Sequence, residues 1–393
     1  WQLGDGSRHT LAGHRGEGRS VQFSPDGSTL LSASADETLR LWNPAPAELL
    51  SPTGIYSVAV QPRRPDQAGE PLFAVAGWEG TITLWQPSAG QPPRAVATLQ
   101  SHQTPIEALA FSPDGALLAS AGSDQDILIW RVTDGTRVAQ LSGNPDRVTA
   151  LGFSPDGTLL ASAGAGPHLN LWPLNPDNPG TTSSPIEMPI DHAEDITSLS
   201  FSPDGEYLAT GSYDRQTKLW RVRSGPTPTL ELLDTLVGQA AAISSLQFSP
   251  DGQTLATGSW DNTIQLWQLK GQGAGATATP GKTLTGHTGG VTSLAFIPDE
   301  AGLISSGADG LVNLWHRADG ELVKTLAGHQ GPVRTVAVIS PEGDWFVSGE
   351  DNGGAMLWEF DLAPLLHQGC ARLEPFLETN AALSESTRSL CDP

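Results

Sequence analysis

Four sets of side chains recur at fixed offsets, and each set combines a histidine, a hydroxyl, an aspartate and a tryptophan. The sets are His14, Ser32, Asp36 and Trp42; His102, Ser120, Asp124 and Trp130; His192, Thr210, Asp214 and Trp220; and His287, Ser305, Asp309 and Trp315. Serine, histidine and aspartate suit acyl transfer, because the aspartate orients the histidine and the histidine takes a proton from the hydroxyl. A nucleophile also needs an exposed oxygen and an oxyanion site. Four copies, one with threonine in place of serine, argue against that chemistry.

We expect each set to form a buried hydrogen-bond relay rather than a catalytic triad. The tryptophan N–H would donate to the hydroxyl, the hydroxyl would meet the imidazole, and the imidazole would meet the carboxylate. Every buried polar atom then has a partner, and the relay joins neighbouring strands and a loop. The sets are therefore interpreted as structural.

The sets belong to a phrase that the chain repeats. "FSPDGSTLLSASADETLRLW" at 23–42 returns in similar form at 111–130 and 201–220. Tryptophans close the phrase about every 45 residues, a period typical of four-stranded blades, at Trp42, Trp85, Trp130, Trp172, Trp220, Trp267, Trp315 and Trp358. Segments such as "VTSLAF" and "TIQLW" are short and β-rich, and "SPDG" between them is typical of a tight turn. The repeat predicts an all-β fold.

The repeated units resemble the WD40 family over almost the whole chain. "AGHRG", "TGHTG" and "AGHQG" match the GH that opens a unit, and "LW" matches its close. The resemblance implies a β-propeller, in which blades ring a central channel and each sequence unit spans two blades. In that family the residues that match the four sets form structural relays.

Eight complete phrases favour an eight-bladed ring over residues 1–360. In this interpretation a strand near residues 9–12 completes the last blade, whose first three strands end at Trp358. The alternative is a seven-bladed ring with one unit left over, belonging to a second propeller upstream. Residues 361–393 have apolar spacing compatible with short helices. This predicted C-terminal helical tail resembles a segment that follows propellers in bacterial WD40 proteins.

Several units depart from the relay pattern. The positions without the expected residue type are Val75, Glu79, Asn144, Gly166, Gln239 and Asn352. We expect these blades to rely on packing or on altered hydrogen bonds, and to open locally more easily than the others.

In the resembled family, the narrower face of the ring binds partners. The loop before the first strand of a blade and the turn before the relay aspartate reach that face. The matching positions here are Tyr56, Trp78, Tyr213, Trp260, Arg19, Glu107, Arg147, Asp195 and Arg334. Exposed tryptophan, tyrosine and arginine are typical of binding hot spots. We expect a protein or peptide partner at these residues; the alternative is that each side chain only covers its own blade.

Charge and composition exclude several classes of partner. The formal net charge of -22 repels nucleic acid and anionic lipid. No apolar run is long enough to span a membrane, and no phosphate-binding loop occurs. We expect a cytoplasmic protein without a cofactor, a metal site or catalytic residues. The chain begins at Trp1, and we expect an upstream domain of the same polypeptide.

Together these observations favour a non-enzymatic interaction scaffold. The resemblance implies the sensor or docking domain of a larger bacterial signalling protein, with a STAND-like NTPase, a kinase or a caspase-like module upstream. Rigid blades would hold several loops in a ring, so that weak contacts add. The alternatives are a propeller hydrolase or lyase with a site at the central channel, and a structural spacer.

Overall fold

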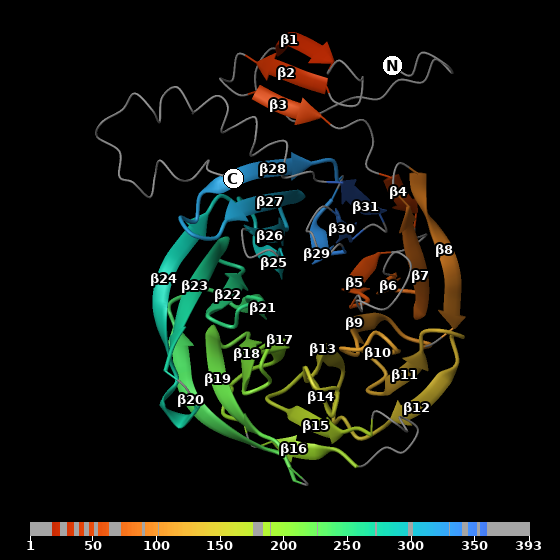
Figure 1. Ribbon diagram of the computed structural model, residues 1–393, viewed down its shortest axis with the longest axis vertical. Coiled ribbons are helices and arrows are strands. Elements are labelled where there is room, and N and C mark those ends of the chain that lie inside the picture. Colours follow the sequence, from red (N-terminus) through yellow and green to blue (C-terminus); the bar gives the residue numbers. More distant parts are fainter. Residues whose placement is uncertain are drawn as a thin grey trace.

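Seven four-stranded antiparallel sheets are arranged in a ring in the computed structural model (Figure 1). The structure describes residues 18–23, 30–34, 39–42, 47–50, 54–62, 72–88, 91–100, 102–175, 184–188, 190–225, 227–271, 273–297, 302–329, 331–339, 345–351 and 354–359. In the described part the fold is all-β, and the single helical element is a 3-10 turn, η1 (Gly273–Gly275).

Each sheet is one blade, and we number the blades in chain order. Blade 1 comprises β5 (Ile55–Val60), β6 (Phe73–Gly77), β7 (Thr81–Ser88) and β8 (Gln91–Gln100). Blade 2 comprises β9 (Ile106–Phe111), β10 (Leu117–Gly122), β11 (Ile127–Arg131) and β12 (Arg137–Leu141). Blade 3 comprises β13 (Val148–Phe153), β14 (Leu159–Gly164), β15 (Leu169–Pro173) and β16 (Ile186–Met188). Blade 4 comprises β17 (Ile196–Phe201), β18 (Tyr207–Ser212), β19 (Gln216–Arg223) and β20 (Thr229–Val237).

The remaining blades complete the ring. Blade 5 comprises β21 (Ile243–Phe248), β22 (Thr254–Ser259), β23 (Thr263–Lys270) and β24 (Thr277–Thr285). Blade 6 comprises β25 (Val291–Phe296), β26 (Gly302–Gly307), β27 (Leu311–His316) and β28 (Leu322–Ala327). Blade 7 comprises β29 (Val333–Val338), β30 (Trp345–Glu350), β31 (Gly354–Glu359) and β4 (Ala47–Leu50).

The "SPDG" sequences make the tight turns between the first and second strands of several blades. In blade 2, Ser112 Oγ donates to Asp114 Oδ1 and accepts from the backbone N–H of Leu117, 2.9 Å away. Gly115 adopts a positive φ of 64°, which glycine tolerates without steric cost. The turn residues thus fix the chain reversal that the sequence predicts.

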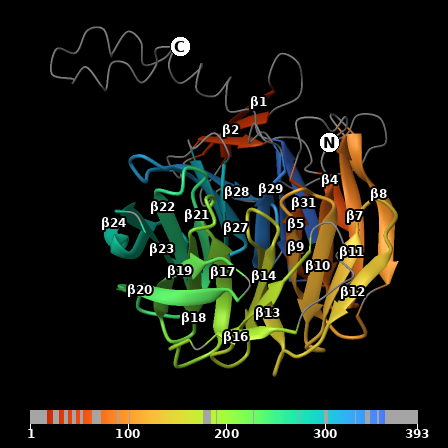
Figure 2. The same ribbon diagram turned by 60° about the horizontal axis from the view of Figure 1, so that its bottom comes forward.

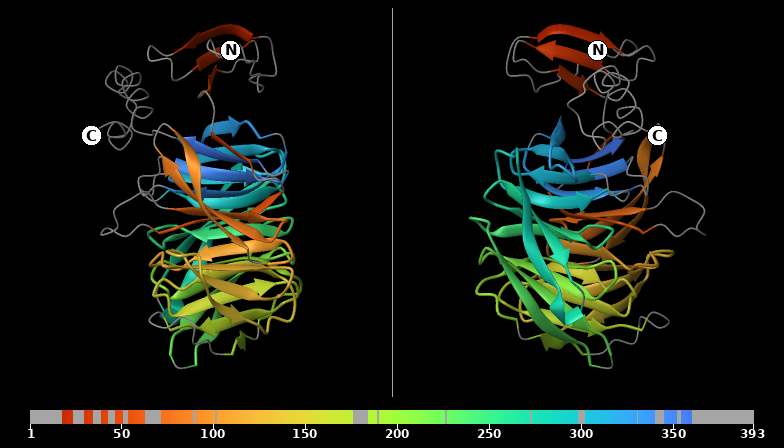
Figure 3. Two further views of the ribbon diagram at one scale, coloured as in Figure 1. Left: turned by 90° about the vertical axis from the view of Figure 1, so that its right-hand side faces the viewer. Right: turned by 60° about the vertical axis from the view of Figure 1, so that its left-hand side comes forward.

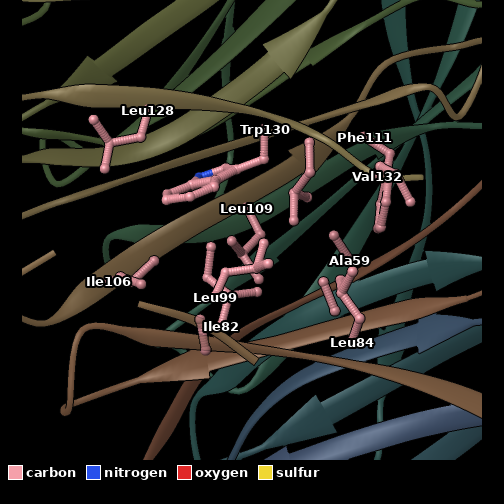
Figure 4. Close-up of a cluster of buried hydrophobic side chains, with 13 residues drawn as sticks. Ala59, Ile82, Leu84, Leu99, Ile106, Leu109, Phe111, Leu128, Trp130 and Val132 are labelled. Carbon is pink, nitrogen blue, oxygen red and sulfur yellow. The ribbon is translucent and has the colours of Figure 1, made fainter. Parts of the chain in front are cut away.

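The core lies between neighbouring blades. The second strands β14, β18, β22 and β26 are buried along their whole length. Figure 4 shows the cluster shared by blades 1 and 2, in which Ile82 and Leu84 from β7 meet Leu109 and Phe111 from β9. Because each sheet is covered on both faces by its neighbours, apolar burial stabilises the ring at every junction between blades.

The prediction of eight blades is wrong. β4 pairs antiparallel with β31, with Leu50 opposite Gly354, and so supplies the fourth strand of blade 7. The first strand of each blade lies nearest the centre of the ring and is called its inner strand (Figure 1). The inner strands of blades 7 and 1, β29 and β5, pack against each other, which closes the ring after seven blades. The strand near residues 9–12 that was expected to close the ring lies outside the described residues. Ring closure follows from the packing of first and last inner strands, which the number of sequence phrases does not determine.

The first sequence unit stands apart from the ring. β1 (Gly18–Phe23), β2 (Leu30–Ser34) and β3 (Leu39–Trp42) form a separate three-stranded sheet. Figures 2 and 3 show this sheet beside the disc of blades. The predicted helical tail, residues 361–393, lies outside the described residues and has no support from the structure.

Candidate functional site

Blade 2 brings the four residues of one predicted relay into contact. Trp130 Nε1 donates to Ser120 Oγ at 3.0 Å, and Ser120 Oγ lies 2.9 Å from His102 Nε2. His102 Nδ1 lies 2.7 Å from Asp124 Oδ2. The chain of contacts connects β10, β11, the loop before β9 and the turn after β10.

Blades 4 and 6 contain the same arrangement. The residues brought together are His192, Thr210, Asp214 and Trp220, and His287, Ser305, Asp309 and Trp315. Burial lowers the pKa of His192 below its ordinary value, against the opposing effect of the Asp214 carboxylate. Of the set in the first unit, His14 and Asp36 lie outside the described residues, and the side chains of Ser32 and Trp42 are not described.

Blade 7 holds a fourth relay, which sequence reasoning missed. His329 Nε2 lies 2.6 Å from Ser348 Oγ, and Trp358 Nε1 donates to the same hydroxyl at 2.7 Å. His329 Nδ1 meets Glu350 Oε2 at 3.2 Å. The carboxylate comes from two residues after the hydroxyl rather than four, and the longer glutamate side chain reaches the imidazole from that position. The available signal was the acidic Glu350 two residues before the expected position, which Asn352 occupies.

In two blades an amide side chain stands in place of the relay histidine. Gln239 in blade 5 accepts from Thr257 Oγ1 at 2.8 Å and donates to the Thr257 carbonyl at 3.0 Å. Asn144 in blade 3 accepts from Ser162 Oγ at 2.8 Å. In blade 1 the hydroxyl position is Val75, which is buried in an apolar cluster shared with blade 7.

The relay hydroxyls that the structure describes are fully buried. Ser120, Thr210 and Ser305 each have 0% exposure. An acyl-transfer nucleophile must be reachable by its substrate, and these oxygens already contact both an imidazole and an indole N–H. The geometry therefore suits cross-linking of strands within a blade.

Each first strand of a blade in the ring carries a β-bulge at its second residue, so that residue is left out of the ladder with the second strand. In blades 3 to 6 this residue has a short hydroxyl side chain that donates to a carbonyl of the next blade. Thr149 Oγ1 donates to Ile196 O at 2.8 Å, and Thr197 Oγ1 donates to Ile243 O at 2.5 Å. Ser244 and Thr292 continue the series to Val291 and Val333.

The other three blades place large or charged side chains at the bulge. The residues are Arg334 in blade 7, Tyr56 in blade 1 and Glu107 in blade 2. Arg334 makes a bidentate ion pair with Asp351, with Nε–Oδ1 at 3.0 Å and Nη2–Oδ2 at 2.9 Å. Glu107 Oε1 accepts from Ser123 Oγ at 3.0 Å. Blades 3 to 6 thus have a serine or threonine at the bulge, whereas blades 7, 1 and 2 have a charged or aromatic residue there.

Three aromatic side chains occupy equivalent turns on the same face of the ring. Trp78, Tyr213 and Trp260 each follow the second strand of a blade, and each donates its backbone N–H to the residue before the inner strand. Their exposures are 56%, 49% and 40%. At the equivalent turns the other blades carry Ser123, Ala165, Ala308 and Asp351. The aromatic side chains are therefore specific to blades 1, 4 and 5.

The exposed Trp78 and Trp260 side chains each pack against a glycine. A Cβ on Gly54 would lie 2.9 Å from Trp78 Cδ1, and a Cβ on Gly290 would overlap the ring of Trp260. The Tyr56 ring packs beside Trp78, with centroids 5.6 Å apart. Glycine at these two positions leaves room for the indoles to lie against the backbone.

The remaining predicted contact residues lie at the same end of blades 3 and 4. Arg147 and Asp195 face each other across neighbouring blades, with Nη2–Oδ2 at 3.7 Å. The side chain of Arg19, in β1, is not described.

Sequence comparisons agree with this architecture. A family model described as the IFT122 first beta-propeller matches residues 55–288, more than half of the chain. The model "WD domain, G-beta repeat" matches residues 6–43, 278–316 and 320–359. The chain belongs to the WD40-repeat β-propeller family.

Curated WD40 relatives cover only part of this propeller. The nuclear distribution protein nudF of Aspergillus flavus is 34% identical over 131 residues, 33% of this chain and 28% of that protein. The nuclear distribution protein PAC1 of Gibberella zeae is 31% identical over 37% of this chain and 33% of its own length. The probable cytosolic iron-sulfur protein assembly protein 1 of Cryptococcus neoformans is 28% identical over 30% of this chain and 24% of its own length. The chain thus spans about a quarter to a third of these fungal relatives, which give no support to a bacterial signalling protein.

A small cavity lies at one end of blade 3. This cavity of about 10 Å³, beside Asn144 and Arg147, has room for one water molecule. Within the described ranges, no three histidine, cysteine, aspartate or glutamate side chains gather as metal ligands would. The same ranges hold no helix that could span a lipid bilayer.

Proposed function

We propose that this WD40 propeller is a non-enzymatic scaffold that binds a protein or peptide partner on the face carrying Tyr56, Trp78, Tyr213 and Trp260. The observation that carries the proposal is the exposure of three large aromatic side chains at equivalent turns, where other blades have small or acidic residues. Exposed aromatic side chains on a rigid frame bind partners at low entropic cost.

The burial of the relay hydroxyls supports a scaffold over a hydrolase that would use them as nucleophiles. The relatives' names speak of nuclear distribution and of iron-sulfur protein assembly, and neither name states a catalytic activity. A cytoplasmic location, and a place as the sensor or docking domain of a longer signalling protein, are finer parts of the proposal. The four relays of blades 2, 4, 6 and 7 are proposed to hold the face in shape.

The test uses the chain as bait in lysate of its source organism, with retained proteins identified by mass spectrometry. A variant with Tyr56→Ala, Trp78→Ala, Tyr213→Ala and Trp260→Ala should lose the partner. A matched control carries Val237→Ala, Leu322→Ala and Val323→Ala, which remove exposed apolar side chains from the outer strands. Circular dichroism checks that both variants are folded. Equal retention by both variants would refute the aromatic face as the binding site.

A further inference from the structure

We propose that Arg334, Asp351, Tyr56, Trp78 and Glu107 form one subsite that binds a lysine or arginine side chain of the partner. We call these five residues the recognition arc. The inference rests on the proposed function, since it names the chemistry of the partner at part of that face.

The first observation is the asymmetry of the bulge positions. In blades 3 to 6 the bulge hydroxyls are used up in hydrogen bonds to the next blade. In blades 7, 1 and 2 the same position carries arginine, tyrosine and glutamate. A bulge re-aims the side chain away from the ladder. The three side chains best suited to recognition therefore fall on three consecutive blades rather than around the whole ring.

The second observation is that these blades are neighbours. β29 packs against β5, and β5 packs against β9. The pKa of the Tyr56 hydroxyl is raised by partial burial and by the Asp351 carboxylate, is lowered by the Arg334 guanidinium, and is raised to a smaller extent by the Glu107 carboxylate. Tyr56 thus lies between the acid of blade 7 and the acid of blade 2, with the Trp78 ring beside it.

The third observation is the balance of charge. Arg334 is matched by Asp351 in a bidentate pair, so this cation is already engaged. Among the described residues, no cation pairs with Glu107, whose Oε1 accepts only from Ser123. Glu79, next to Trp78, is exposed. The subsite is therefore net negative, as is the whole chain at -22.

A cationic side chain fits this combination better than an anionic one. An ammonium or guanidinium group over the faces of Trp78 and Tyr56 gains cation–π attraction, and the Glu107 carboxylate adds charge complementarity. The acidic field of the chain also steers a basic segment toward the ring. An acidic partner would have to displace Asp351 from Arg334.

The test measures fluorescence anisotropy of two labelled synthetic peptides at physiological salt. One is Gly-Ala-Arg-Gly-Lys-Gly-Arg-Ala-Gly, and the other has glutamate at each basic position. The basic peptide should bind, and the acidic one should not. Glu107→Gln should weaken binding of the basic peptide about 3-fold or more, and Trp78→Ala about 5-fold or more.

The matched control is Glu206→Gln, which changes the net charge by the same amount in the turn at the opposite end of the strands of blade 4. It should leave binding unchanged. Equal weakening by Glu107→Gln and Glu206→Gln, equal binding of both peptides, or no binding of the basic peptide at about 1 mM would each overturn the inference. If a lysate partner depends on the four aromatic residues yet is unaffected by Glu107→Gln, the proposed function stands and this inference alone fails.

Discussion

The Asp195 carboxylate of blade 4 accepts a hydrogen bond from the backbone N–H of Gly166 in blade 3, with Oδ1 2.8 Å from N. Gly166 occupies the position of the relay aspartate, so blade 3 has no acid of its own there. The Gly166 N–H is bound instead by a carboxylate of the adjacent blade, so this hydrogen bond joins blades 3 and 4.

Replacement of Asp195 should therefore loosen the junction of blades 3 and 4. We expect Asp195→Ala to lower the free energy of unfolding by about 1 kcal/mol, because the Gly166 N–H loses its acceptor. Asp195→Asn should cost less, since the amide oxygen can still accept. Urea unfolding of the three proteins measures the difference, and equal stability of the alanine variant and the parent would contradict the assignment.

Gly290→Ala tests the packing of the Trp260 ring against Gly290. The new Cβ would lie 2.9 Å from Cζ3 of the indole, so the ring must move. We expect a loss of about 1–3 kcal/mol in the free energy of unfolding, the usual cost of overpacking. Gly275→Ala is the control, because a Cβ there meets nothing within 4 Å. An unchanged Trp260 environment in a crystal structure of the Gly290 variant would argue against the contact.

The blade 7 relay predicts an unusual dependence on side-chain length. Glu350→Asp keeps the charge but withdraws the carboxylate from His329, and we expect it to cost about 1–3 kcal/mol of unfolding free energy. Glu350→Gln keeps the length and an acceptor oxygen, so it should be the milder change. Chemical denaturation ranks the two variants. The opposite order would show that charge, rather than reach, matters at this position.

The buried histidine of blade 4 predicts a loss of stability in mild acid. Burial lowers the pKa of His192 in the folded state, so the unfolded chain binds its proton more readily. Its contribution is present above the ordinary histidine value of about 6.5 and is lost as the pH falls below that value. The pKa of Asp214 is also lowered, but its contribution is lost only below the ordinary aspartate range.

We therefore expect the free energy of unfolding to fall between pH 7.5 and pH 5.5, and to fall less in a His192→Gln variant. Glutamine is the residue that blade 5 uses at this position, as Gln239. His168→Gln, which removes a partly exposed histidine, is the matched control. Urea titrations at both pH values give the comparison, and identical slopes for all three proteins would contradict the prediction.

The sequence predicted the blades but not their number. Each unit contains its own turns and alternating strands, so local patterns suffice to place β10 or β18. The outer strands range from three residues in β16 to ten in β8, and nothing in Ala47–Leu50 marks it as the partner of Gly354–Glu359 rather than of its own unit. That pairing is decided by the packing of inner strands around the ring, which is a property of the assembled molecule.

At the candidate site, differences in side-chain length limited what the sequence could predict. A fixed offset located the acids of blades 2, 4 and 6, but Glu350 meets His329 from a different offset because its side chain is longer. The exposure of Trp78 and Trp260 followed from their place in the turns. Their packing against Gly54 and Gly290 depends on how close the indole rings lie to the backbone of these glycines in the folded chain, and sequence spacing does not reveal that distance.

The closing strand has a consequence for biosynthesis. β4 leaves the ribosome before every other strand of the ring, yet its partner β31 is the last strand of the ring to be made. Until β31 is made, β4 has no pairing partner in blade 7. The order of synthesis makes this the last strand pairing that the ring can complete. Contacts so distant in sequence form slowly, so the nascent chain spends most of its translation as an open arc that chaperones or other strands could engage.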